Sequence, residues 1–155
     1  VNKVSSLINK KKIINNVITI VNFYKKNFNK QIKIAITGLN PHCYSAYKND
    51  EESLIIKPAI EFLKKRKFNI FGPFSADTSF IKKNLNRFDV IIGMYHDQVL
   101  APFKTLFEQK AINITLGIPF IRISPDHGVG SDIVGKKQAD PTSLIECINF
   151  FKNLK

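Results

Sequence analysis

The apolar run at residues 90–93 (VIIG) constrains the fold most, because it leads directly into a cluster of polar side chains. A short run of this kind is typical of a strand buried on both faces of a parallel sheet. The run continues through Met94, and His96, Asp97 and Gln98 follow at the expected carboxyl end of the strand. Ligands in open α/β sheets bind outside the carboxyl ends of the strands, where the next helix also presents unpaired N–H groups. We therefore expect a functional site here.

The segments before this run alternate between helical and strand-like patterns. Apolar residues at helical spacing predict a packing helix over 13–28, and 32–37 is strand-like. A second helical pattern over 55–63 contains Pro58, which either lies in the first turn or kinks a longer helix. A short strand over 69–71 follows. Strands that alternate with helices predict an α/β fold with a parallel sheet and helical crossovers.

Two histidines follow strands in equivalent positions. His42 ends the loop after the strand at 32–37, and His96 follows the strand at 90–93, so the two imidazoles can converge. With Asp77 or Asp97 nearby they would suit a divalent transition metal such as zinc. The other interpretation is that these are solvated loop histidines.

Asp77 also has two interpretations. It lies in the predicted loop over 72–78, where it either caps a helix that begins at Thr78 or contributes a carboxylate to the site. The residues alone favour the capping role.

Three more polar residues stand beside strand-like stretches over 111–116 and 118–123: Lys104, Asn113 and Arg122. The glycine-containing turn over 124–130 either approaches a phosphate through backbone N–H groups or is a plain loop.

The end of the chain predicts a structural helix. Asp140 would be its N-cap and Pro141 its first residue. The apolar residues on one face of this helix are Leu144, Ile145, Ile148 and Phe151.

Length and composition bound the class of protein. A chain of 155 residues that is 44% hydrophobic predicts one ordinary core and thus one domain. No apolar run has the roughly 20 residues of a membrane span, and no signal-peptide pattern is present, so we expect a soluble cytoplasmic protein without a membrane partner. Cys43 and Cys147 form no metal or redox spacing and are expected to be free thiols. The chain starts at Val1 without a capping or turn signal, which suggests that a segment upstream is missing.

The formal charge of +12 raises the possibility of nucleic-acid binding. The basic residues lie in scattered runs at 10–12, 64–67, 82–83 and 136–137, and few aromatic residues accompany them as a base-stacking platform would require. We therefore expect a solvated basic surface and no nucleic-acid partner.

Four segments resemble, in the same order, signature motifs of the 4-hydroxythreonine-4-phosphate dehydrogenase family of vitamin B6 biosynthesis. They are GLNPH (38–42), GPFSADT (72–78), MYHDQ (94–98) and NITLGIPFIR (113–122), and the turns DHG (126–128) and DIVG (132–135) resemble later motifs. The resemblance spans nearly the whole chain but only about the C-terminal half of such an enzyme. Residues 43–47 and 129–130 depart from the usual family pattern.

The resemblance implies a fold of two α/β/α domains related to the isocitrate and isopropylmalate dehydrogenases. The active site would lie in the interdomain cleft at a homodimer interface, and residues 1–155 would be mostly the second domain. The implied activity is the NAD- or NADP-dependent oxidation of 4-hydroxythreonine 4-phosphate, followed by decarboxylation to 3-amino-2-oxopropyl phosphate, on the route to pyridoxal 5'-phosphate.

The family motifs also imply roles for single residues. His42 and His96 match two of three histidines that hold a divalent metal (zinc, cobalt or magnesium), and the third would lie upstream. Asp77 matches a site aspartate, and Lys104 matches a residue that grips the substrate, so these two are the expected catalytic residues. Asn113 and Arg122 would bind the substrate together with Lys104.

Two functional hypotheses remain open. The chain is either part of such a dehydrogenase, or a catalytically inactive remnant that acts as a dimerising or basic binding module. If the chain is part of such an enzyme, we expect it, when isolated, to expose an apolar face that the absent part would cover.

Overall fold

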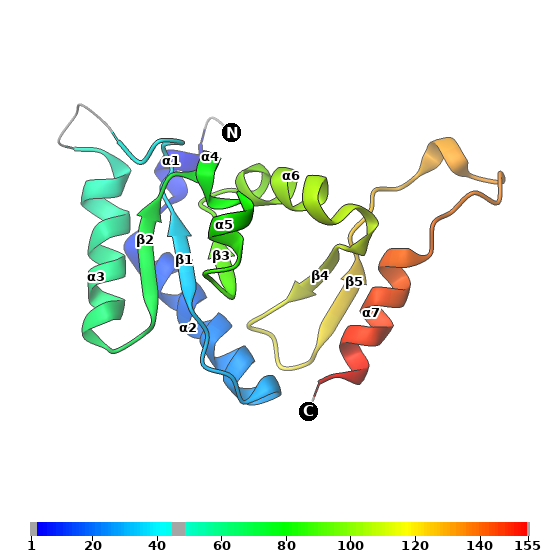
Figure 1. The fold of residues 1–155 in the computed structure, drawn as a ribbon, viewed down its shortest axis with the longest axis horizontal. Coiled ribbons are helices and arrows are strands. Elements are labelled where there is room, and N and C mark those ends of the chain that lie inside the picture. Colours follow the sequence, from blue (N-terminus) through cyan, green and yellow to red (C-terminus); the bar gives the residue numbers. More distant parts are fainter. Residues whose placement is uncertain (1–2, 45–48, 155) are drawn as a thin grey trace.

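Three parallel strands organise the part of the chain that carries both candidate histidines. The computed structural model describes residues 3–44 and 49–154, so residues 45–47, which depart from the family pattern, lie outside it. The strands are β1 (Ile34–Thr37), β2 (Ile70–Phe74) and β3 (Val90–Ile92). Their order is β2-β1-β3, and both outer strands run parallel to β1, which confirms the predicted α/β arrangement (Figure 1). Parallel pairing brings the three carboxyl ends to one edge, where His42 and His96 follow β1 and β3.

Two helices pack against this sheet and supply half of the buried core residues. They are α2 (Lys10–Phe28) and α3 (Lys57–Lys65), and a single turn, α1 (Val4–Leu7), precedes them. The side-chain oxygen of Asn9 caps α2 by accepting a hydrogen bond from the Lys12 N–H at 2.8 Å. Asn29 ends this helix in the left-handed conformation (φ 50°). The helix predicted over 13–28 and its end at the following turn are therefore confirmed.

Ten buried apolar side chains form the core. They are Ile13, Val17, Ile32, Ile34, Ile36, Ile56, Ala59, Ile60, Leu63 and Ile70. Successive side chains of a strand point to opposite faces, so Ile34 and Ile36 enter the same core from β1. Both are fully buried, and the core therefore gives β1 a rigid base beneath the loop that carries His42.

A π-helical turn, η1 (Glu52–Ile56), precedes α3 and accommodates Pro58. This proline lies in the first turn of α3, where the lack of a backbone N–H costs few helical hydrogen bonds. The first-turn interpretation is therefore confirmed. The same π-helical turn buries the side chain of Glu52, which is 2% exposed.

β2 is longer than predicted, and two short helices follow it. These helices are α4 (Ala76–Ser79) and α5 (Lys82–Leu85). The prediction of a loop over 72–78 was wrong at both ends, since the strand continues to Phe74 and α4 begins at Ala76. Pro73 is tolerated because β2 is an edge strand, where a missing N–H can face away from the ladder.

β3 is parallel, as predicted, but the prediction that it is buried was wrong. All three of its residues are half-buried, because β3 lies at the second edge of the sheet. Helix α6 (His96–Phe107) follows β3 after three connecting residues and leads to the last third of the chain (Figure 1).

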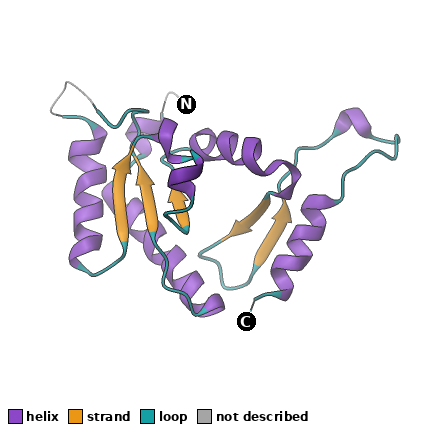
Figure 2. Cartoon of the chain, viewed as in Figure 1, coloured by secondary structure: helices purple, strands orange, loops and turns teal. Residues whose placement is uncertain are grey.

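The last third of the chain forms a second, smaller unit that the sequence patterns did not predict. Two antiparallel strands, β4 (Ile112–Thr115) and β5 (Arg122–Pro125), pair in a hairpin (Figure 2). Short 3₁₀ turns, η2 (Glu108–Lys110) and η3 (Ser131–Ile133), flank this hairpin. The strand-like stretch over 118–123 was only partly right, since residues 118–121 belong to the connection between the strands. An antiparallel pair can be joined by such a short connection, whereas a parallel pair cannot.

Helix α7 (Thr142–Lys152) packs on the hairpin. It begins one residue later than predicted, so Pro141 and not Asp140 holds the cap position, although Asp140 still accepts a hydrogen bond from the Thr142 N–H at 2.8 Å. Ser143 and Cys147 are its buried residues. The apolar face is between 49% and 60% exposed, and it consists of Leu144, Ile145, Ile148 and Phe151. This agrees with the expectation of an uncovered apolar surface.

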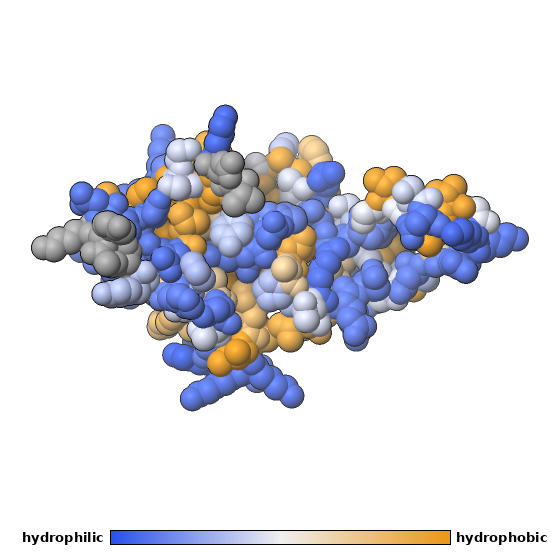
Figure 3. Space-filling view, turned by 90° about the horizontal axis from the view of Figure 1, so that it is seen from above, coloured by the Kyte–Doolittle hydropathy of each residue, from blue (hydrophilic) through white to orange (hydrophobic). Residues whose placement is uncertain are grey.

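The basic runs lie on the surface. The lysines and arginine at 10–12, 64–67, 82–83 and 136–137 are all exposed, as predicted. Seen from above, hydrophilic side chains cover much of the molecule and separate several hydrophobic groups (Figure 3). Within the described residues, no helix combines the length and the apolar composition needed to cross a bilayer.

Candidate active site

The loop after β1 places His42 beside Asp77. The Nδ1 atom of His42 lies 3.1 Å from Oδ2 of Asp77, which is in the first turn of α4. Asp77 is therefore not the cap of a helix that begins at Thr78, since Ser75 holds the cap position and α4 has already begun at Ala76. A carboxylate on Nδ1 fixes the imidazole and leaves Nε2 free to bind a ligand.

His96 has the same kind of partner. It is the first residue of α6, and its Nδ1 atom lies 2.7 Å from Oδ1 of the neighbouring Asp97. The two histidine side chains are 76% and 75% exposed, so both are accessible to a ligand from solvent.

The chemistry of these donors suits a transition metal. Imidazole is a ligand that zinc and cobalt prefer, whereas magnesium prefers oxygen, and a carboxylate bound to the second ring nitrogen raises the basicity of the imidazole. Among the residues that the structure describes, no group of three His, Cys, Asp or Glu side chains is placed to hold a metal. The metal site predicted from His42 and His96 therefore stays a prediction.

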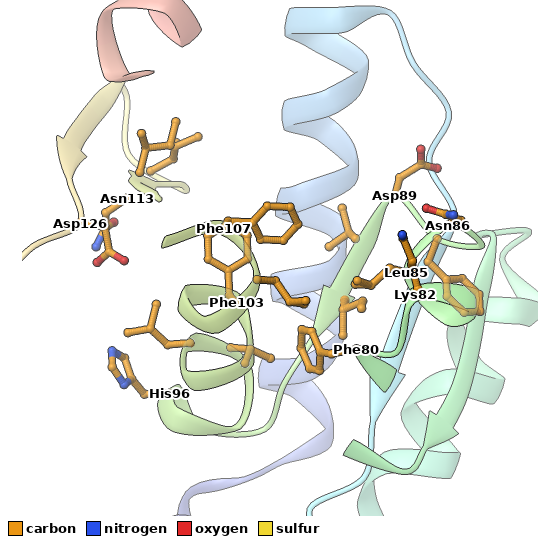
Figure 4. Close-up of a pocket in the computed structure, with 18 residues that line it drawn as sticks. Phe80, Lys82, Leu85, Asn86, Asp89, His96, Phe103, Phe107, Asn113 and Asp126 are labelled. Atoms are coloured by element: carbon orange, nitrogen blue, oxygen red, sulfur yellow. The ribbon is translucent and has the colours of Figure 1, made fainter. Parts of the chain in front are cut away.

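A cavity of about 840 Å³ lies between β3, α6 and β4, and His96 and Asn113 are both among its lining residues. Its wall is largely apolar, with Phe103 and Phe107 of α6 prominent (Figure 4). The structure thus brings His96 and Asn113, 17 residues apart in the chain, to one cavity. In Figure 4 they lie on the same side of it, together with Asp126.

Lys104 reaches the same region from α6. Its ammonium group donates a hydrogen bond to the backbone carbonyl of Asp126 at 2.8 Å and lies 3.4 Å from the Asp126 carboxylate. The Lys104 side chain is 42% exposed. Lys104 thus holds its positive charge close to the cavity that Asp126 lines, but it is already paired with this carboxylate.

Arg122 lies further along the hairpin. It is exposed and donates a hydrogen bond to the Thr115 hydroxyl at 2.8 Å. The register pairs Asn113 with Ser124 and Thr115 with Arg122. Asn113 and Arg122 are therefore diagonal neighbours on the same face of the hairpin. Arg122 is not among the residues that line the cavity.

The glycine-containing turn after β5 projects from both sheets (Figure 1). Val129 is 95% exposed, and a Cβ atom built at Gly128 would meet nothing within 4 Å. Its approach to a phosphate therefore stays a prediction.

Sequence reasoning assigned no role to two residues whose polar side chains are buried behind the histidine loops. Glu52 accepts a hydrogen bond from the Asn40 N–H at 2.7 Å, and Gln98 is bonded to the ends of both β1 and β3. Only the position of Gln98 next to the His96-Asp97 pair gave a signal. Glu52 gave none, because an acidic residue near a helix start is ordinarily exposed.

Both cysteines are free, as predicted. Burial raises the pKa of the Cys43 thiol, which lies in the loop of His42, and the nearby Glu52 carboxylate raises it further. Burial also raises the pKa of Cys147. Neither thiol is therefore an activated nucleophile at neutral pH.

Together the fold and the site define a parallel α/β protein in which polar and ionisable residues gather at the carboxyl ends of the strands. This is the arrangement of α/β domains that bind small ligands. The comparisons with known proteins agree with this class.

The family model described as pyridoxal phosphate biosynthetic protein PdxA matches residues 1–151. A 4-hydroxythreonine-4-phosphate dehydrogenase of Sulfurihydrogenibium sp. is 47% identical over 154 residues, which are 98% of this chain and 47% of that protein. The same enzyme of Xanthobacter autotrophicus is 43% identical over 79% of this chain and 35% of its own length. The crystal structure of 4-hydroxythreonine-4-phosphate dehydrogenase from Klebsiella pneumoniae superposes with a TM-score of 0.79 at 30% identity, over 96% of this chain and 46% of that one.

The chain belongs to the PdxA family of pyridoxal phosphate biosynthetic proteins. The Sulfurihydrogenibium and Klebsiella proteins match nearly all of this chain, but the chain spans only about half of their length. The resemblance predicted from the motifs, including the partial coverage, is thereby confirmed.

Proposed function

We propose that this chain contributes part of the active site of an NAD- or NADP-dependent dehydrogenase that oxidises 4-hydroxythreonine 4-phosphate. The oxidation would be followed by decarboxylation to 3-amino-2-oxopropyl phosphate, as a step in the formation of pyridoxal 5'-phosphate. The observation that carries the proposal is the family match over 151 residues, combined with His42 and His96 at the carboxyl ends of adjacent parallel strands. In this proposal residues 1–155 are the C-terminal portion of a two-domain cytoplasmic enzyme that works as a homodimer.

His42 and His96 would bind the divalent metal, with the Nδ1 atom of each held by a carboxylate. Bound there, zinc or cobalt would act as a Lewis acid toward the substrate hydroxyl and the carbonyl that replaces it. Asp77 holds the His42 ring in one orientation, and its exposed carboxylate can also accept a proton from a substrate. This gives Asp77 both a positioning and a proposed acid–base role.

Lys104, Asn113 and Arg122 would bind the anionic groups and the polar atoms of the substrate. Lys104 would first have to exchange its contact with Asp126 for the substrate. Within residues 3–44 and 49–154, Arg122 has one neutral hydrogen-bond partner, which leaves further N–H donors for a phosphate or carboxylate. A nicotinamide cofactor supplies the hydride acceptor. The residues that would hold this cofactor are unknown.

The metal ligands can be tested by titrating zinc or cobalt into the wild-type chain and into His42→Ala and His96→Ala. Each substitution should weaken binding, because each removes one of two imidazole ligands. Equal affinity in all three proteins would contradict the assignment.

The substrate residues can be tested through Arg122→Ala. If Arg122 makes charge-assisted hydrogen bonds in a shielded cleft, its loss should cost on the order of 2–3 kcal/mol of binding free energy for a phosphorylated hydroxy-amino acid. Retention on duplex DNA at increasing salt provides the comparison. Tight, strongly salt-dependent DNA binding, with no effect of Arg122→Ala on the small ligand, would favour the basic binding module.

The uncovered apolar face of α7 is also what a dimerising module would present. A direct test of activity distinguishes this alternative from the dehydrogenase. The assay is NADH formation from 4-hydroxythreonine 4-phosphate with added divalent metal. It should be run on the chain alone and on the chain mixed with a polypeptide that corresponds to the other half of its relatives. We expect little or no turnover by the chain alone and turnover after mixing, because a cleft needs both walls. No activity in either sample would support the inactive module.

A further inference from the structure

Gln98 is the one buried residue of α6 in the part of the chain that the structure describes, and it is polar. Its side-chain oxygen accepts hydrogen bonds from the Thr37 hydroxyl at 2.9 Å and from the Met94 N–H at 2.7 Å. Its amide nitrogen donates to the Gly38 carbonyl at 2.7 Å. One planar amide therefore uses both of its ends to join the carboxyl ends of β1 and β3.

These partners precede the two histidines by a few residues. Gly38 opens the loop that ends at His42, and Met94 lies two residues before His96. A change in the position of the Gln98 amide would therefore move the two loops relative to each other. Backbone pairing between β1 and β3 ends at Ile36 and Ile92, so it does not reach either histidine.

The surroundings of Gln98 leave room for this amide and for little else. A Cβ atom at Gly93 would lie 2.5 Å from Val99 Cγ1 and 3.3 Å from the Gln98 oxygen. A Cβ atom at Gly38 would collide with Cys43 Sγ and lie 2.8 Å from a carboxylate oxygen of Glu52. Both glycines thus permit a close approach that any other residue would prevent.

Glu52 holds the His42 loop from its other side. Its buried carboxylate accepts the Asn40 N–H, and the Asn40 side chain accepts the His42 N–H at 3.0 Å. The loop is therefore connected at Gly38 to Gln98 and at Asn40 to Glu52. Of these two connections, only the one through Gln98 continues to the segment of His96.

We propose that Gln98 is a positioning residue that sets the placement of His42 relative to His96. The expected effect on metal affinity rests on the proposed function. The expected effect on the placement of the two histidines applies to the protein without metal. Residues that orient metal ligands without touching the metal typically change metal affinity about 10- to 100-fold when they are replaced. A residue that only stabilised the fold would leave the affinity of the folded protein unchanged.

The test uses Gln98→Met, which keeps a long side chain but cannot make the three hydrogen bonds, and the matched pair Thr37→Val and Thr37→Ser. Thr37→Val removes the hydrogen bond to Gln98 at 2.9 Å and a longer one to the Ile92 carbonyl at 3.3 Å, whereas Thr37→Ser keeps the hydroxyl. The full chain is titrated with cobalt in the absence of urea, and the midpoint of its urea unfolding is measured in a separate experiment. We expect about a tenfold loss of cobalt affinity in Gln98→Met, a smaller loss in Thr37→Val, and near wild-type affinity in Thr37→Ser.

The imidazole proton signals of His42 and His96 in the metal-free protein give a second readout. They should shift or broaden in Gln98→Met and Thr37→Val and be restored in Thr37→Ser, while the amides of β1 keep their protection from hydrogen exchange. Wild-type affinity and ring signals in Gln98→Met, with only a lower unfolding midpoint, would overturn the proposal. If Gln98→Met does not fold, Thr37→Val decides by the same criteria.

The controls separate this proposal from the proposed function. If His42→Ala and His96→Ala do not weaken cobalt binding, the metal site is wrong, and the ring signals of the metal-free variants still decide whether Gln98 positions the histidines. If both substitutions weaken binding but the Gln98 and Thr37 variants behave as wild type in both readouts, the metal site stands and the role of Gln98 is refuted.

Discussion

Replacing Ser143 with alanine should loosen the attachment of α7 to the hairpin. Ser143 is 2% exposed, and its hydroxyl donates to the Ala111 carbonyl at 2.5 Å and accepts from the Asp126 N–H at 3.0 Å. It thus joins α7 both to the start of β4 and to the end of β5. Asp126 is also the partner of Lys104, so the change should reach the candidate site.

The expected cost follows from the two groups that Ser143→Ala leaves without a partner. A buried polar group that loses its hydrogen bond costs about 1–3 kcal/mol. The Ala111 carbonyl belongs to a residue that is 1% exposed and should bear most of this penalty, whereas Asp126 is half-buried and its N–H can partly be solvated. The sum is roughly 2–4 kcal/mol for the small unit. Its buried side chains are few, so this is a large share of what holds α7 in place.

Urea denaturation should measure the change in stability, and hydrogen exchange followed by mass spectrometry should locate it. Peptides from α7 and β5 should exchange faster in Ser143→Ala, while peptides from α2 should not change. Thr105→Ala is the matched control, because the Thr105 hydroxyl donates to the Ala101 carbonyl on an exposed helix surface, where its loss should cost less than about 0.5 kcal/mol. Equal stability of the two variants, with unchanged exchange in α7, would refute the reasoning.

Three further predictions concern the larger unit. Leu63→Ala, at a fully buried position, should lower the free energy of unfolding in urea by about 3 kcal/mol. The control Leu54→Ala, at a 59% exposed position, should change it by less than about 0.5 kcal/mol. Similar effects of the two substitutions would contradict the assigned core. Asn9→Ala should cost about 1 kcal/mol because it removes the N-cap of α2, and unchanged helix content and melting would exclude this role. The hydrogen-bonded ammonium of Lys30 holds the pKa of Asp89 below its ordinary value, so the stability that this carboxylate contributes is present above about pH 4 and lost as the pH falls through the lowered pKa. The stability difference between wild type and Asp89→Asn, about 1 kcal/mol at pH 7, should therefore shrink below pH 4, and a difference independent of pH would disprove the linkage.

The sequence by itself determined the features that depend on local geometry. The helical spacing of Ile13 and Val17 and the turn at Asn29 defined α2, because backbone periodicity decides which side chains share a face. The alternation of strands and helices predicted the parallel sheet, and that topology placed His42 and His96 at the carboxyl ends of its strands. The motifs around these residues also identified the family, since motif order is a property of the chain.

Only the tertiary structure decided which side chains meet. His42 and Asp77 are 35 residues apart and Thr37 and Gln98 are 61 apart, and no local pattern encodes either contact. Burial failed to follow from hydrophobicity for the same reason. The apolar residues of β3 lie at a sheet edge and the apolar face of α7 stays about half exposed, whereas the polar Gln98 and Glu52 are buried. A side chain's burial depends on what other segments pack against it, and a buried polar group is stable only where those segments supply its hydrogen bonds.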